Sequence, residues 1–202
     1  MAFKNYNTLG EVLTAYQIQN VRVAFPEPLP PIAPPDGLRQ EIAFIQQTIF
    51  YRNSEAAVCE NIIYPILKEV WRPFSDSLAI WSHQPLVWNE LLNGVPDYMF
   101  AKKSPLGRAV FESPFVAVVE AKRDDFALGW VQCLQEMYAI QQLNQSPNPV
   151  FGIVSNGDNW QIGQLDGLTF LEYIDLFTLT NLDELFSALT WVLACCKRIY
   201  NL

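Results

Sequence analysis

Apolar residues recur every three or four positions in several stretches of the chain, and this spacing predicts amphipathic helices. The first helix is expected over residues 8–16, where Thr8 and Glu11 have the spacing of a capping box. Ser54 and Asp125 are expected to cap later helices, because short polar side chains accept hydrogen bonds from the free N–H groups of a first turn. The longer predicted helices cover residues 38–49, 54–71, 126–143 and 181–198.

Other stretches alternate between apolar and polar residues or are continuously apolar, as β-strands are. Candidate strands are residues 21–25, 78–82, 96–101, 115–120, 150–155 and 160–165. Phe115–Glu120, which reads FVAVVE, is typical of a strand buried on both faces of a sheet. Asn156-Gly157 separates the last two strands and favours a hairpin turn. The order of these elements predicts an α/β fold with a central mixed β-sheet flanked by helices.

A proline-rich stretch divides the chain into unequal parts. Six prolines lie within PEPLPPIAPP, at residues 26–35, which excludes a helix or a central strand there. We therefore expect an N-terminal helical appendage at residues 1–25, a linker at residues 26–36 and one main domain at residues 37–202.

Composition and charge restrict the possible functions. Half of the 202 residues are hydrophobic, which is ample for a buried core. The formal net charge is −8, with only 13 Lys and Arg residues, so we do not expect the chain alone to make a large, tight contact with duplex DNA. A phosphodiester substrate stays possible, because cations bound to carboxylates reverse the local charge.

Several other classes of site are also excluded or not expected. His83 is the only histidine, which excludes metal sites built from several histidines. Four cysteines lack zinc-site spacing and are expected to be reduced thiols, namely Cys59, Cys133, Cys195 and Cys196. Residues 1–12 lack the apolar core of a signal peptide, and the longest apolar stretch, Leu185–Cys196, is too short to span a bilayer. We therefore expect a cytoplasmic protein with no membrane partner.

Two carboxylates and a lysine form the candidate chemical site. Asp97 follows Pro96 at the start of one predicted strand, and Glu120-Ala121-Lys122 ends the apolar strand. Glu120 and Lys122 are two residues apart, so on a strand their side chains point to the same face. Burying such charges is costly unless they are paired or coordinate a metal ion. This combination supplies oxygen ligands for Mg²⁺ and a cation beside them, as phosphodiester hydrolysis requires.

The pattern of Pro96-Asp97 and Glu120-Ala121-Lys122 resembles the PD-(D/E)xK nuclease superfamily. The resemblance extends over roughly residues 38–200 and is strongest to the nuclease domains of type I restriction enzymes, which FGIVSNGDNWQIGQL also resembles. It implies a restriction endonuclease-like three-layer fold. It also implies that Asp97, Glu120 and the Ala121 carbonyl bind Mg²⁺, with Mn²⁺ as a substitute, and that Lys122 serves catalysis.

The resemblance implies further site residues on two helices. A glutamate upstream of the motif is expected to support the metal or a water, and Glu60 is preferred to Glu55. Gln132 or Gln135 is expected to contact the site or the nucleic acid. Each has a simpler interpretation, in which the glutamates lie on the polar flank of one helix and the glutamines on a solvated face of another.

Three basic residues, Lys102, Lys103 and Arg108, lie between the two motif strands and either contact phosphate or occupy a solvated hairpin. Arg123 has the same two interpretations, and Asp124 is expected to cap a helix. Two functions remain open. The first is a metal-dependent nuclease acting on DNA, and the second is a catalytically silent nuclease-like module that binds nucleic acid or protein. A homodimer or a partner subunit is possible in either case.

Overall fold

The computed structural model describes residues 6–26, 29–122 and 125–202. Its α-helices are α1 (Leu9–Tyr16), α2 (Asp36–Thr48), α3 (Glu55–Val58), α4 (Tyr64–Trp71), α5 (Phe126–Asn144) and α6 (Leu182–Ile199). The π-helical turn η2 (Cys59–Ile63) joins α3 to α4. Three short 3₁₀ segments complete the helical structure, namely η1 (Tyr51–Asn53), η3 (Arg72–Phe74) and η4 (Leu179–Asn181).

The strands of the described residues form one eight-stranded sheet and one small hairpin. The large sheet contains β1 (Gln19–Val23), β2 (Leu78–Ser82), β5 (Tyr98–Lys102), β6 (Phe115–Ala121), β7 (Val150–Ser155), β8 (Asn159–Asp166), β9 (Thr169–Tyr173) and β10 (Phe177–Thr178). The order across the sheet is β1-β9-β8-β7-β6-β5-β2, with β10 paired to β8. β6 with β7 and β1 with β9 are parallel pairs, and the others are antiparallel. The hairpin is β3 (Leu86–Val87) with β4 (Asn93–Gly94).

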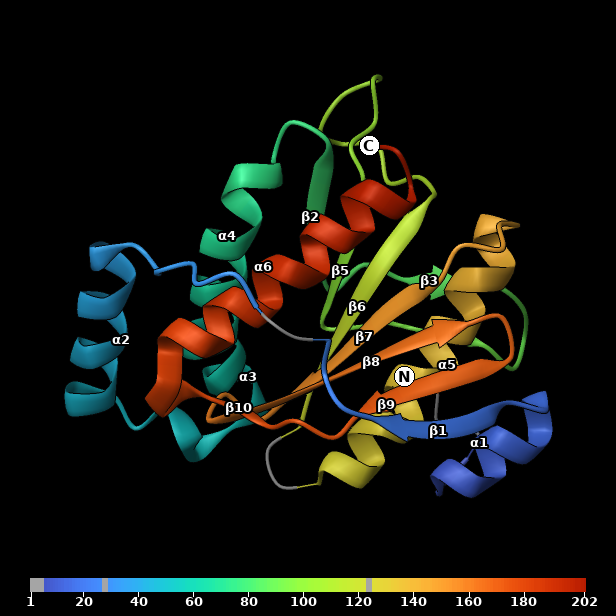
Figure 1. The fold of residues 1–202 in the computed structure, drawn as a ribbon, viewed down its shortest axis with the longest axis horizontal. Helices are drawn as coiled ribbons and strands as arrows, with labels where there is room; N and C mark the ends of the chain where they lie inside the picture. The colour runs from blue at the N-terminus through green and yellow to red at the C-terminus, as the bar shows by residue number, and fades with distance from the viewer. Residues whose placement is uncertain (1–5, 27–28, 123–124) are drawn as a thin grey trace.

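Helices cover both faces of the sheet and produce two hydrophobic cores (Figure 1). One core contains Ala117 and Val119 of β6 together with apolar residues of α2, α4 and α6. The other contains Val118, the residue between them, with apolar residues of α1 and α5. This division follows from the period of two along a strand, which sends successive side chains to opposite faces. The predicted α/β fold, with a mixed central sheet flanked by helices, is confirmed.

Local signals in the sequence also form as predicted. Thr8 and Glu11 make the capping box of α1, Ser54 caps α3, and Asp125 caps α5. β7 and β8 form the hairpin expected at Asn156-Gly157. The segment expected as an N-terminal appendage contributes β1 to the main sheet, and α1 contacts α5. No helix in the described part of the chain combines the length and apolar character needed to cross a membrane.

Gly163 marks a close contact between β8 and two aromatic side chains. A Cβ atom at this position would lie 2.6 Å from the Phe170 ring and 2.9 Å from the Trp130 ring, which are both buried. We expect Gly163→Ala to lower the free energy of unfolding by about 1–3 kcal/mol, because rigid rings must shift to admit the methyl group. Urea denaturation measures this change. Gly10→Ala on α1 is the control, since no atom lies within 4 Å of its added Cβ, and equal stability of the two variants would contradict the close contact.

Candidate active site

The register of β5 and β6 brings the two motif carboxylates together. Tyr98 of β5 pairs with Val119 of β6, and the two strands are antiparallel. Asp97, just before Tyr98, therefore lies opposite Glu120, just after Val119. The backbone N–H of Ala121 donates a hydrogen bond of 2.7 Å to Oδ2 of Asp97. Asp97 is therefore tied directly to the strand that carries the other motif residues.

Lys122 connects the carboxylates of the site. Its Nζ donates to Oε1 of Glu120 at 2.7 Å and to the Ala121 carbonyl at 3.1 Å. The Lys122 backbone N–H donates to the Ser155 carbonyl at 2.8 Å, which extends the pairing of β6 with β7. A Cβ on Gly129 of α5 would lie 3.2 Å from Cγ of Lys122, so the glycine leaves room for the lysine stem to pass along the helix.

Burial and mutual repulsion perturb the ionisation of this group. Burial raises the pKa of Glu120 to about 8, the Asp97 charge adds to the rise, and Lys122 opposes it. Burial also raises the pKa of Asp97, while the Ala121 N–H and the Lys122 charge act against the rise. Burial acts to lower the pKa of Lys122, but the charge and hydrogen bond of Glu120, together with the charges of Glu55 and Asp97, outweigh it and the pKa is raised. The site therefore favours the presence of positive charge.

A pocket of about 580 Å³ opens beside Asp97. Its walls come from α3, η2, the end of β2 and the start of β5, and its lining residues are Glu55, Ala56, Cys59, Glu60, Tyr64, Ser82, His83, Asp97 and Tyr98. Nδ1 of His83 lies 3.7 Å from Oδ1 of Asp97. Among these lining residues there are three carboxylates and one histidine but no lysine or arginine, so the described lining of the pocket is acidic.

The two candidate upstream glutamates both line this pocket, but they differ in their contacts. Oε1 of Glu55 lies 3.7 Å from Nζ of Lys122, and its charge contributes to the raised pKa values of Asp97 and Glu120. Glu60 is exposed on the π-helical turn and forms no ion pair within the described part of the chain. The geometry therefore favours Glu55 over Glu60 as the upstream glutamate.

The face of α5 that was interpreted as solvated is buried. Gln132 is 6 % exposed and Gln135 is 0 % exposed, and Nε2 of Gln135 donates to the Val131 carbonyl. A solvated face is therefore wrong for both glutamines, because α5 is covered by the sheet on one side and by α1 on another.

Glu136 is a buried acid near the site that sequence reasoning missed. Its side chain is fully buried, and neither carboxylate oxygen has a hydrogen-bond partner among the described residues. Burial, followed by the charges of Glu120 and Asp97, raises the pKa of Glu136 well above its usual value. The available signal was its spacing of four from Gln132 within an apolar helix, which places both polar side chains on one face.

The donor atoms expected for a divalent cation are suitable in kind. The carboxylates of Asp97 and Glu120 and the carbonyl of Ala121 are hard oxygen ligands, which Mg²⁺ binds together with waters. Glu120 and the Ala121 carbonyl already accept hydrogen bonds from the Lys122 ammonium, so their oxygens already attract a cation. Across residues 6–26, 29–122 and 125–202, no three His, Cys, Asp or Glu side chains are grouped as ligands for a metal ion. A cation here would thus depend on two carboxylates, a carbonyl and water, and on a shift of Lys122.

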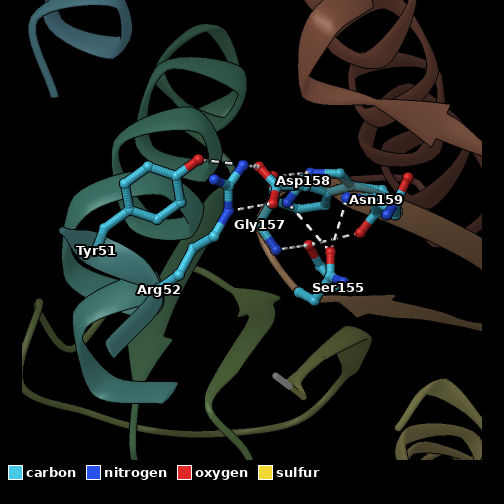
Figure 2. Close-up of polar contacts among 8 residues, drawn as sticks. Tyr51, Arg52, Ser155, Gly157, Asp158 and Asn159 are labelled. Atoms are coloured by element: carbon cyan, nitrogen blue, oxygen red, sulfur yellow. Dashed lines mark hydrogen bonds and ion pairs between the residues drawn. The ribbon is translucent and has the colours of Figure 1, made fainter. Parts of the chain in front are cut away.

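A second polar cluster holds the helix that carries Glu55 against the sheet (Figure 2). The carboxylate of Asp158 accepts hydrogen bonds from Tyr51 Oη at 2.9 Å and from Arg52 Nε and Nη2 at 2.7 and 2.9 Å. In the same turn, Oγ of Ser155 accepts from the Gly157 N–H and donates to the Asn159 carbonyl.

This cluster lies between two parts of the candidate active site. η1, which carries Tyr51 and Arg52, leads directly into Ser54 and Glu55. At the other end, the Ser155 carbonyl accepts the Lys122 backbone N–H. The Arg52–Asp158 contact therefore fixes the start of α3 relative to the strand that positions Lys122.

We expect Asp158→Asn to lower the free energy of unfolding by about 1–2 kcal/mol. The change removes the charge that pairs with Arg52 and weakens the hydrogen bond from the buried Tyr51. Chemical denaturation measures the effect. Glu69→Gln is the matched control, because Glu69 also accepts two hydrogen bonds from an arginine, Arg72. Those residues are only three positions apart in the chain, so we expect this substitution to lower the free energy of unfolding by less. An equal effect of both substitutions would contradict a role in joining separate elements.

The other basic candidates lie away from the carboxylates or outside the described residues. Lys102 ends β5, about 17 Å along the strand from Asp97 at its start. Lys103 and Arg108 line a separate pocket beside β2, and Nζ of Lys103 donates to the Ser75 carbonyl. Arg123 and Asp124 lie outside the described residues.

The chain was compared with known protein families and with individual curated proteins. None of the family models matches the chain, and none of the curated proteins is significantly similar to it.

Proposed function

We propose that the protein is a metal-dependent nuclease that hydrolyses phosphodiester bonds of DNA at Asp97, Glu120 and Lys122. The observation that carries the proposal is the convergence of the three side chains at neighbouring ends of β5 and β6, beside an open pocket. Their order and spacing resemble the PD-(D/E)xK motif, in which these residue types perform this reaction. Restriction endonuclease-like topology is part of the proposal.

Each group has a distinct task in this reaction. Asp97, Glu120 and the Ala121 carbonyl would hold the cation. When bound, Mg²⁺ would lower the pKa of a water and neutralise charge on the phosphate. Lys122 remains protonated beside Glu120, so its ammonium is able to stabilise negative charge on the reacting phosphate. Glu55 lies near Lys122 and restrains its position.

A second function, a silent module that binds a partner, is favoured by two observations. The Lys122 ammonium satisfies both Glu120 and the Ala121 carbonyl, so two expected metal ligands are engaged inside the protein. The acidic pocket has no lysine or arginine in its described lining to attract DNA. In this case the cluster stabilises the fold without binding a catalytic ion.

The two functions are distinguished by metal binding and cleavage measured on the unmodified protein. Isothermal titration calorimetry with Mg²⁺ and Mn²⁺ reports the cation, and gel assays with plasmid, linear and single-stranded DNA report hydrolysis. The nuclease proposal expects both cation binding and cleavage that EDTA abolishes. Absence of both would overturn it and leave the silent module.

A further inference from the structure

β2 is the last strand at one end of the large sheet, and no strand of the described residues pairs with its outer edge. The backbone N–H of His83 donates to the Asp97 carbonyl, and that of Lys103 donates to the Ser77 carbonyl. In an antiparallel ladder the hydrogen-bonded pairs recur at every second residue. Ala79 and Trp81 therefore bond to β5, while the backbone groups of Ile80 between them point outward.

Most of the outward-pointing backbone groups of β2 have no hydrogen-bond partner among the described residues. The Leu78 carbonyl accepts a hydrogen bond from Nε1 of Trp71 at 2.8 Å. Neither the N–H nor the carbonyl of Ile80 is bonded by any side chain or loop among the described residues. An exposed row of such groups is a template for another extended chain.

A groove of about 280 Å³ runs along this edge. Its floor is residues 78–81 of β2, and its walls include Trp71 at the end of α4 and the connection between β5 and β6. Lys103 and Arg108 in that connection are exposed and are the charged residues of the described lining. The groove therefore offers backbone pairing, an apolar surface and positive charge in a chain whose net charge is −8.

The backbone groups and positive charge of the groove favour some binding partners over others. A second copy of this chain would bring the same two cations, Lys103 and Arg108, and no acidic residue of the described lining to complement them, so charge does not favour a dimer at this edge. Nucleic acid phosphates accept hydrogen bonds from lysine and arginine but have no donor for the Ile80 carbonyl. An extended peptide supplies both backbone donors and acceptors, and acidic side chains complement the two cations.

We propose that the edge of β2 binds an extended acidic peptide segment of a partner protein, which adds to the sheet as a further strand. This inference is independent of the proposed nuclease activity, because the groove and the active-site pocket share no described lining residues.

The test measures fluorescence anisotropy of a labelled peptide of alternating valine and glutamate. Ile80→Pro removes the outward N–H while leaving the bonds of Ala79 and Trp81 to β5, since proline is tolerated on an edge with its nitrogen facing out. Arg108→Glu reverses one exposed charge of the groove and does not depend on how well the proline variant folds. Lys197→Glu on α6 makes the same charge change elsewhere. Thermal melts establish that each variant is folded.

We expect the peptide to bind the unmodified protein and the Lys197→Glu variant equally. Binding is expected to weaken by about tenfold in Ile80→Pro and in Arg108→Glu, from loss of backbone bonding and charge respectively. No binding, or binding unchanged in Arg108→Glu, would overturn the proposal. If a peptide of alternating valine and lysine bound as tightly as the valine–glutamate peptide, acidic side chains would not be required, and the proposal would also be overturned. Displacement by a single-stranded oligonucleotide at similar affinity would assign the groove to nucleic acid, and dimerisation lost in Ile80→Pro would assign it to a second copy.

Discussion

Replacing Asp97 by asparagine or Lys122 by methionine is expected to reduce Mg²⁺-dependent DNA cleavage by roughly two to three orders of magnitude or more. Asp97→Asn removes one of the two charged ligands in the proposed metal site while keeping an acceptor for the Ala121 N–H. Lys122→Met keeps the apolar stem that packs near Gly129 but removes the ammonium that, in the proposed reaction, stabilises charge on the phosphate. Initial rates on linear DNA at saturating Mg²⁺ measure both losses.

Matched variants separate chemistry from folding in this experiment. Glu41→Gln on α2 and Lys197→Met on α6 change exposed residues of the same types and are expected to retain full activity. Calorimetry should show weakened Mg²⁺ binding in Asp97→Asn and retained binding in Lys122→Met. Full cleavage by either site variant would contradict its assignment to the active site.

The stability of the metal-free protein is expected to fall as pH rises from about 4.5 to about 8. Glu120 has a pKa of about 8 in the folded protein, against a usual value of 4.5, because it is buried beside Asp97. A carboxyl with a raised folded pKa stabilises the fold fully below its unfolded pKa and loses this contribution as pH rises through the folded value. Asp97 and Glu136 have raised pKa values and act in the same direction.

Glu120→Gln should make this pH dependence shallower by up to ~1.4 kcal/mol per pH unit, because the amide takes up no proton. Urea denaturation at several pH values in EDTA measures the slope, with Glu184→Gln on the surface of α6 as the control. Adding Mg²⁺ should stabilise the unmodified protein most at the alkaline end of this window, where Glu120 is ionised. A slope identical in all three proteins would show that Glu120 does not titrate in this range.

The sequence alone was sufficient for most of the local structure and for the three motif residues of the candidate site. Periodicity located the main helices and the central strands, because burial of one face selects residues at the repeat of each element. The caps at Ser54 and Asp125 were predictable because they depend on neighbouring residues only. The motif residues Asp97, Glu120 and Lys122 were identified by their type and by their positions at strand ends.

Only the tertiary structure decided how distant segments meet. The parallel pairing of β1 with β9 joins residues about 150 positions apart, and no short-range pattern specifies such a partner. From the sequence, Glu60 was preferred to Glu55, but in the folded chain it is Glu55 whose carboxylate lies near Lys122. Glu136 was not identified from the sequence, and only the packing of α5 shows it to be buried. In each case the deciding contact depends on the placement of whole elements, which the sum of long-range packing determines and local sequence does not encode.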